Sequence, residues 1–125
     1  MYRIPMHGYF LEDARMGLSQ ELARGTVMPI VLSLLNQQPM YGYELVKTVN
    51  DRTNGVLQWK EGTLYPLLHK MQAQRLIKAK WETSEETGKQ RKYYHITPKG
   101  EKLLTESKTQ WQQLSDAVNV LLALG

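Results

Sequence analysis

The residue types that usually perform catalysis or bind metal ions are sparse in this chain. The 125 residues include no cysteine, which excludes disulfides, thiolate zinc sites and cysteine nucleophiles. The three histidines, His7, His69 and His95, have no metal-ligand spacing. Serines and acidic residues form no nucleophile elbow, glycine-rich phosphate loop or pair of catalytic carboxylates. We therefore expect no enzyme, no metal site and no cofactor.

The basic residues offer a different chemistry, because their excess is confined to one part of the chain. Residues 60–92 contain eight lysines and arginines against four acidic residues, whereas the rest of the chain contains eight of each. The formal net charge of +4 therefore comes from this segment alone. A localised cationic field is typical of proteins that bind a polyanion. A solvated basic face that only favours solubility is the alternative, and charge alone leaves it open.

Three helices are predicted in the first three quarters of the chain. Apolar residues cover nearly every side of a helix within residues 18–35, so this helix should be buried, with Thr26 as its expected N-cap. A second helix, at residues 41–50, carries one apolar stripe with helical spacing. A third is expected at residues 61–76, with Thr63 as its N-cap.

The third helix has two different faces. Pro66 is expected in its first turn, where a missing N–H removes no intrahelical bond. One face is apolar and carries Leu64, Leu67, Leu68, Met71 and the stem of Arg75. The opposite face carries small and basic residues, Gly62, Pro66, His69, Lys70 and Ala73. Such a helix can pack through one side and lie close to another surface through the other.

The hydrophobic period then changes from 3.6 to 2, which predicts a β-hairpin. The first strand is expected from Ile77 to Glu82, with its apolar residues ending at Trp81. The second strand is expected from Lys89 to Ile96, after a polar turn that contains Gly88. Basic residues alternate along both strands, so the hairpin is positively charged.

A long last helix follows, with Thr97 as its N-cap and Pro98 at the first helical position. Apolar residues recur along it with heptad spacing, which suits a partner helix in coiled-coil packing. We expect the contacts of a homodimer from Leu104, Trp111, Leu114, Val118, Leu121 and Leu122. Packing within one chain is the alternative, since the strip spans only about three heptads.

This order of elements is that of a winged helix-turn-helix, and the fold class is mainly α with a small β-hairpin. We expect an N-terminal arm (1–20), a DNA-binding domain (21–97) and a C-terminal dimerisation helix (98–125). The major groove of DNA admits one α-helix, and the hairpin can then reach the adjacent backbone. Contacts to the DNA are expected from Tyr41, Tyr43, Lys60, Thr63, Tyr65, Pro66, His69, Lys70, Lys89, Arg91 and Lys92.

Three separated motifs resemble the PadR family of transcription regulators. They are Tyr41-Gly42-Tyr43-Glu44, then Glu61-Gly62-Thr63-Leu64-Tyr65-Pro66 with Leu68 and Met71, then Arg91-Lys92-Tyr93-Tyr94 with Ile96, Thr97 and Gly100. The resemblance covers residues 21–122. It implies a regulator, usually a repressor, that binds operator DNA and dimerises through the C-terminal helix. The family includes repressors of phenolic-acid stress genes and regulators of multidrug efflux.

The resemblance also implies a role for Trp111. In some short members of the family, a tryptophan on the C-terminal helix stacks on planar ligands between the subunits. Trp111 matches that position, which implies a planar aromatic effector. An aromatic anchor at the centre of the subunit interface is the alternative interpretation.

Two other classes of function are compatible with this sequence. One is a winged-helix module for protein–protein interaction, and the other is a protein that binds drugs or phenolic compounds without binding DNA. The basic excess favours DNA binding over the protein–protein module, which would not need it, whereas quenching of tryptophan fluorescence by planar aromatic compounds, abolished by Trp111→Ala, would support the other. Residues 1–11 contain no apolar run typical of a signal peptide or a membrane span, so we expect a soluble cytoplasmic protein with no membrane partner.

Overall fold

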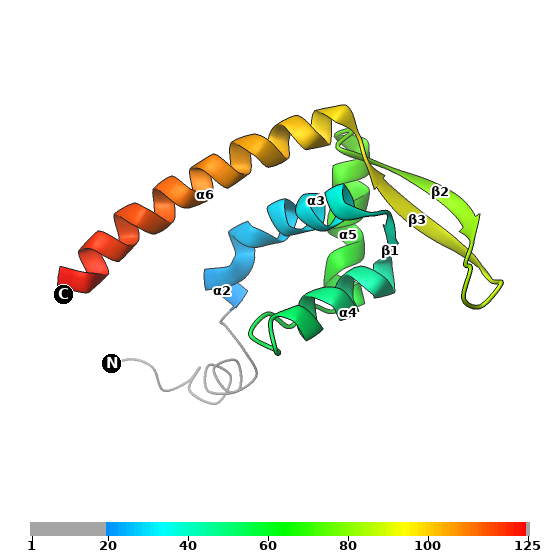
Figure 1. Cartoon of the computed structure of the whole chain (residues 1–125), viewed down its shortest axis with the longest axis horizontal. Helices are drawn as coiled ribbons and strands as arrows, with labels where there is room; N and C mark the ends of the chain where they lie inside the picture. The colour runs from blue at the N-terminus through cyan, green and yellow to red at the C-terminus, as the bar shows by residue number, and fades with distance from the viewer. Residues whose placement is uncertain (1–19, 125) are drawn as a thin grey trace.

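The computed structural model describes residues 20–124, which form a helical head with a small sheet at one side and one long helix that extends from it (Figure 1). The elements are α2 (Gln20–Ala23), the 3-10 helix η1 (Arg24–Thr26), α3 (Val27–Gln37), β1 (Met40–Tyr41), α4 (Gly42–Arg52), α5 (Glu61–Ala73), β2 (Ile77–Thr83), β3 (Gln90–Ile96) and α6 (Pro98–Leu124). The predicted fold class is confirmed. The arm predicted at residues 1–20 lies outside the described residues, except for Gln20.

The first predicted helix, at residues 18–35, is divided in the structure. Thr26 lies in the 3-10 turn with helical backbone angles, and its hydroxyl donates a hydrogen bond to the Ala23 carbonyl at 2.7 Å. Thr26 is the N-cap residue of α3, as predicted, but its side chain makes no capping hydrogen bond to that helix. Gly25 has a low helix propensity, and a threonine hydroxyl competes for backbone carbonyls, so an interruption here has a local cause.

The start of α5 also differs from the prediction. The helix begins at Glu61 with Lys60 in the extended N-cap position, and Thr63 lies inside the first turn rather than at the cap. Pro66 consequently lies in the second turn, where its missing N–H leaves the Gly62 carbonyl without its usual helical partner. Both residues are exposed, so water can satisfy that carbonyl.

The buried side of α5 is close to the one predicted. Leu64, Leu68 and Met71 are buried, and Leu67 packs against them at the edge of the core. Arg75 is the exception, because it follows the helix in a left-handed conformation at φ 63° and is exposed. The aliphatic stem of Arg75 therefore does not extend the apolar face.

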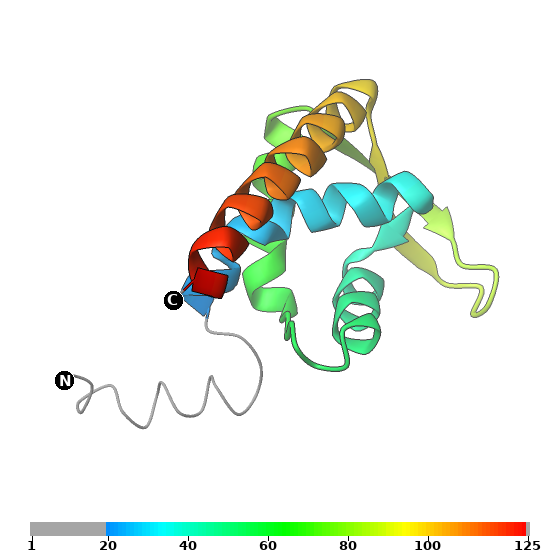
Figure 2. The same ribbon diagram turned by 60° about the vertical axis from the view of Figure 1, so that its left-hand side comes forward.

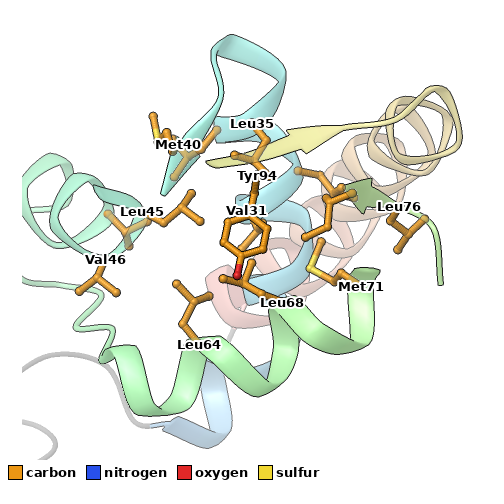
Figure 3. Close-up of a cluster of buried hydrophobic side chains, with 14 of the residues drawn as sticks. Val31, Leu35, Met40, Leu45, Val46, Leu64, Leu68, Met71, Leu76 and Tyr94 are labelled. Carbon is orange, nitrogen blue, oxygen red and sulfur yellow. The ribbon is translucent and has the colours of Figure 1, made fainter. Parts of the chain in front are cut away.

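The core lies where α3, α4, α5 and β3 meet (Figure 3). Tyr94 enters it from β3 with 1% of its surface exposed, among Val31, Leu45 and Leu68, which are each fully buried. Complete burial of such a side chain stabilises the fold by about 1.5–3 kcal/mol. One tyrosine of the hairpin thus packs against α3, α4 and α5 together.

The sheet has the strand order β1-β3-β2, and all of its pairs are antiparallel. The predicted hairpin is confirmed, and Tyr94 at its centre pairs with Ala79 on one side and Met40 on the other. The two-residue strand β1 was not predicted, because two residues are too short to show a period. It joins the start of α4 directly to the hairpin.

The long helix α6 begins as predicted. Pro98 is its first residue, and the Thr97 hydroxyl accepts a hydrogen bond from the Gly100 N–H at 3.1 Å. The helix packs beside α3 before it extends beyond the head (Figures 1 and 2). Leu104 lies in this packed part and is 4% exposed, so its assignment to a dimer contact is wrong. The apolar residues with heptad spacing therefore begin in the part of α6 that packs against its own head.

Candidate nucleic-acid interface

The outward face of α5 is exposed over its whole length, as the helical period predicts. Its residues are small, polar or basic, namely Gly62, Thr63, Pro66, His69, Lys70 and Ala73. His69 and Lys70 supply hydrogen-bond donors at the middle of the helix. The glycine, proline and alanine residues are small and project little from the helix. A helix with such a face can approach base edges in a groove closely.

Tyr65 lies at the boundary between this face and the core. Its ring covers Gly42 at the start of α4, so that a Cβ at Gly42 would lie 2.6 Å from the Tyr65 Cζ atom. Its hydroxyl donates a hydrogen bond to the Glu61 carboxylate at 3.2 Å. Burial of the phenol, and then the charge of Glu61, raises the pKa of Tyr65. The phenol therefore stays neutral and holds α5 against α4.

The two tyrosines at the start of α4 differ: Tyr43 faces solvent, whereas Tyr41 is the N-cap residue. Tyr43 is 51% exposed, as a contact to the DNA backbone requires. Tyr41 occupies the N-cap, where its N–H points to the Glu44 carboxylate at 3.4 Å. The sequence analysis missed this pairing, although a carboxylate three residues after an N-cap is a known capping signal. Glu44 therefore occupies one of the amides that a phosphate could have used.

Tyr41 is also part of a stack that includes the hairpin. The Arg91 guanidinium carbon lies 4.4 Å from the centroid of the Tyr41 ring, and Tyr93 meets the same ring edge-on with centroids 5.5 Å apart. The Arg91 Nε atom is buried and has no hydrogen-bond partner among the described residues. Arg91 is thus half-buried against an aromatic ring, whereas we expected it to extend toward a phosphate.

The other cations expected at the interface are less constrained. Lys60, at the N-cap of α5, and Lys89, in the hairpin turn, are both exposed. Lys92 is half-buried, with its Nζ atom 5.8 Å from the centroid of the Tyr94 ring. On the opposite face of the hairpin, His95 Nε2 and Glu82 Oε2 lie 3.0 Å apart. Lys60 and Lys89 therefore remain the cations that can reach an approaching phosphate most freely.

Trp81 is a surface feature that the sequence analysis missed. Strict alternation places it on the same face as Ile77 and Ala79, and this alternation predicted a strand without indicating which of its residues face solvent. The structure leaves Trp81 68% exposed, opposite Lys92 in the register of the hairpin. The hairpin extends beyond the core, so a residue can continue the apolar alternation and still face solvent. No pattern within the strand indicates where the core ends.

Residues 20–124 show neither a metal-binding cluster nor a membrane-spanning helix. No group of three histidines or acidic residues in this range could hold a metal ion. None of the helices in the same range is both long enough and apolar enough to span a membrane.

Comparison with known proteins identifies the family. Residues 31–106 match the model of the transcriptional regulator PadR-like family. The chain belongs to the PadR family. A relative, the uncharacterized protein X of Lysinibacillus sphaericus, is 31% identical over 102 residues, which are 82% of this chain and 93% of that protein.

Solved structures agree with this assignment. A PadR-like transcriptional regulator from Bacillus cereus is 38% identical with a TM-score of 0.74, over 82% of this chain and 96% of that one. A PadR family transcriptional regulator from Eggerthella lenta is 34% identical with a TM-score of 0.75, over 98% of this chain and all of that one. The protein is therefore a winged-helix transcriptional regulator that binds DNA, and it is not an enzyme.

Proposed function

We propose that this PadR regulator represses transcription by occupying an operator as a homodimer. In this proposal α5 enters the major groove, and the β2–β3 hairpin lies over the neighbouring backbone. The observation that carries it is the exposed, small and basic face of α5, whose other face is buried in the core. Direct contacts are assigned to Tyr43, Lys60, Thr63, Pro66, His69, Lys70, Lys89 and Lys92. The other three predicted residues, Tyr41, Tyr65 and Arg91, are assigned a supporting role, in which they hold α4, α5 and the hairpin in position.

The proposed contacts are of two kinds, those to base edges and those to phosphates. His69 and Lys70 lie at the middle of α5 and read base edges, whereas the lysines at its N-cap and in the hairpin turn neutralise phosphates. Base contacts set the preference among sequences, and phosphate contacts strengthen binding to every sequence.

Support for the homodimer comes from α6. Beyond Leu104 the helix carries a strip of large apolar side chains that its own chain leaves exposed by 40–72%. The members of this strip are Trp111, Leu114, Val118, Leu121 and Leu122. Contiguous exposed apolar surface of this kind marks an interaction site, and heptad spacing suits a second α6. Two heads joined in this way would present their α5 helices about 34 Å apart, one turn of DNA.

The proposed effector is a planar aromatic molecule that stacks on Trp111 where two copies of α6 meet. Trp111 is 56% exposed in one chain and begins the strip nearest to the head. A ligand between the helices would change the spacing of the two heads, and coupling between such sites is typically about 1–3 kcal/mol. The family resemblance supports this assignment.

The test of DNA binding is a titration with the duplex upstream of the protein's own gene at several salt concentrations. Binding dominated by phosphates should weaken with a log–log slope of about −0.9 for each phosphate neutralised. His69→Gln should change the ranking of operator variants, whereas Lys89→Ala should weaken binding to all of them equally. A flat response to salt contradicts the proposed contact mode.

A further inference from the structure

A cavity of about 240 Å³ lies at the start of α5. Its walls come from three segments that are distant in sequence: the end of α2 with η1 and the start of α3, the loop between α4 and α5, and the first turn of α5. Val27, Leu57 and Trp59 give it a largely apolar lining. Its volume is that of roughly eight water molecules, which suits one aromatic side chain.

The loop wall of this cavity is fixed by hydrogen bonds. The Asn50 side chain accepts from the Trp59 N–H at 2.7 Å and donates to the Trp59 carbonyl at 3.1 Å. The Thr53 hydroxyl accepts from the Leu57 N–H at 3.1 Å and donates to the Val49 carbonyl at 2.8 Å. Two polar side chains at the end of α4 thus hold the loop in place, and the cavity needs no occupant to form it.

The charges around the cavity all have one sign. Arg24 and Lys60 are its charged lining residues, and no acidic residue lines it. Both are exposed, and neither has a hydrogen bond or ion pair to another residue in the range 20–124. An apolar lining with two unpaired cations fits an occupant that carries an apolar side chain next to carboxylates.

The chain itself carries this combination before the described residues begin. An apolar run at residues 9–11, with Phe10 at its centre, is followed directly by Glu12 and Asp13. These two are the only acidic residues in positions 1–19. The order of the segment, apolar and then acidic, therefore complements the lining of the cavity in both polarity and charge.

The place of this segment along the chain favours the cavity of its own head. Ala23, the last residue of α2, lines the cavity, and α2 has four residues, so the described chain begins about 6 Å from the cavity wall. The step from Asp13 to Gln20 can span at most about 25 Å when extended. So short a tether keeps the segment at a local concentration in the millimolar range.

We propose that residues 9–13 dock into the cavity of their own head. The Phe10 ring lies in the apolar lining beside Trp59. The carboxylates that follow it pair with Arg24 and Lys60. Because Lys60 is the N-cap of α5 and is assigned above to a phosphate, the docked segment competes with DNA for it. This consequence for DNA binding rests on the proposed function, whereas the docking does not.

Disulfide formation in the full-length protein tests the docking, because the chain has no cysteine of its own. In Leu11→Cys with Val56→Cys, one cysteine replaces a half-exposed lining residue, and Phe10 stays in place. Oxidation with copper phenanthroline should join the two within one chain, which mass spectrometry reports as the loss of the thiol hydrogens. Gly25→Cys in place of Val56→Cys is the matched control, because Gly25 is exposed, nearer in sequence and outside the lining. This control pair should react at least about tenfold more slowly.

Variants of the segment test its two kinds of contact. Phe10→Ser should slow formation of the disulfide to residue 56 by about tenfold, and so should Glu12→Lys with Asp13→Lys. Combining the two lysines with Arg24→Glu and Lys60→Glu should restore the rate to within about threefold, because the charges are opposite again.

Three results overturn the docking. The first is a control with Gly25→Cys that reacts as fast as Val56→Cys, and the second is an unchanged rate in Phe10→Ser. The third is faster crosslinking of Val56→Cys to Leu122→Cys, which assigns the cavity to the exposed end of a second α6. A linked dimer from Leu11→Cys with Val56→Cys overturns the placement in the same head. Circular dichroism checks that each variant is folded.

Operator affinity tests the competition for Lys60. Glu12→Gln with Asp13→Asn should raise the affinity by about threefold or more, because a surface ion pair no longer holds the lysine. Glu101→Gln with Glu106→Gln removes the same charge from exposed positions of α6 and should change the affinity less. Equal effects of the two pairs overturn the competition. If the disulfide pattern holds but the protein binds no operator, the proposed function fails and the docking stands.

Discussion

The Arg91 guanidinium lies over the Tyr41 ring, with 4.4 Å between the guanidinium carbon and the ring centroid. Tyr41 is the last residue of β1 and the N-cap of α4, so this contact connects the hairpin to the start of α4. A cation–π contact of this kind stabilises by about 0.5–2 kcal/mol. Arg91 therefore orients the hairpin relative to α4 and α5, whereas Lys89 in the hairpin turn is free to meet a phosphate.

Arg91→Ala and Lys89→Ala should consequently differ in their response to salt. Lys89→Ala removes a phosphate contact, and we expect the log–log slope of operator affinity to become shallower by about 0.9. Arg91→Ala removes the stack, and we expect weaker operator binding with an unchanged slope and a loss of unfolding free energy of about 0.5–2 kcal/mol. Fluorescence anisotropy at five salt concentrations and urea denaturation measure these quantities.

Thr87→Ala, in the same turn, is the matched control and should leave the slope unchanged. If the slope becomes shallower in Arg91→Ala as much as in Lys89→Ala, Arg91 neutralises a phosphate and the orienting role is wrong.

Gly42 and Tyr65 form a second contact between α4 and α5 that can be tested by stability. A Cβ at residue 42 would meet the Tyr65 ring, so Gly42→Ala should lower the unfolding free energy by about 1–3 kcal/mol. Tyr65→Phe removes only the hydroxyl bonded to Glu61 and should cost about 0.5–1.5 kcal/mol. Chemical denaturation gives both values.

The double variant Gly42→Ala with Tyr65→Ala supplies the check on that contact. Because the ring that Cβ would meet is gone, it should be less destabilised than the sum of its two single variants. Strict additivity would show that the ring does not restrict residue 42.

Leu104 and Leu114 occupy the same heptad pattern on α6 but should behave differently. Leu104 is buried in its own head, so Leu104→Ala should lower the unfolding free energy by about 2–5 kcal/mol and leave the protein dimeric. Leu114 is 56% exposed, so Leu114→Glu should yield monomers at micromolar concentration. Light scattering reports the mass, and Gln113→Glu adds the same charge to a neighbouring exposed residue as the control. A monomeric wild type contradicts the proposed dimer.

Tyr94 gives the stability a dependence on alkaline pH. Burial raises the pKa of the Tyr94 phenol in the folded chain above the value of about 10 in the unfolded chain. Above that pH the unfolded chain loses a proton that the folded chain keeps, so the free energy of unfolding falls as pH rises. Tyr94→Phe should show a shallower fall than the wild type between pH 9 and about 11, measured by urea denaturation. Identical slopes would contradict this role of Tyr94.

The sequence was sufficient to predict whatever depends on local periodicity. The apolar face of α5, the alternation of the hairpin and the capping of α6 by Thr97 all follow from residue types at fixed spacing, and the structure confirms them. The family assignment followed from motifs at three separate places, and the family model confirms it.

The features that sequence reasoning missed depend on where the core ends. Trp81 and Leu104 each continue a regular apolar pattern, yet Trp81 faces solvent and Leu104 is buried in its own head. A period identifies a face but gives no information about how far the neighbouring element extends along it. The stack of Arg91 on Tyr41 joins residues 50 positions apart through a strand of two residues, which has no period to read.

DNA cleavage directed from α5 tests the central claim most directly. Because the chain has no cysteine, His69→Cys can be labelled uniquely with an iron chelate and bound to the duplex upstream of the protein's own gene. We predict cleavage in two patches about 34 Å apart, and little or none from Thr109→Cys on α6 labelled in the same way. Cleavage from residue 69 no stronger than that from residue 109 would contradict the placement of α5 in the groove.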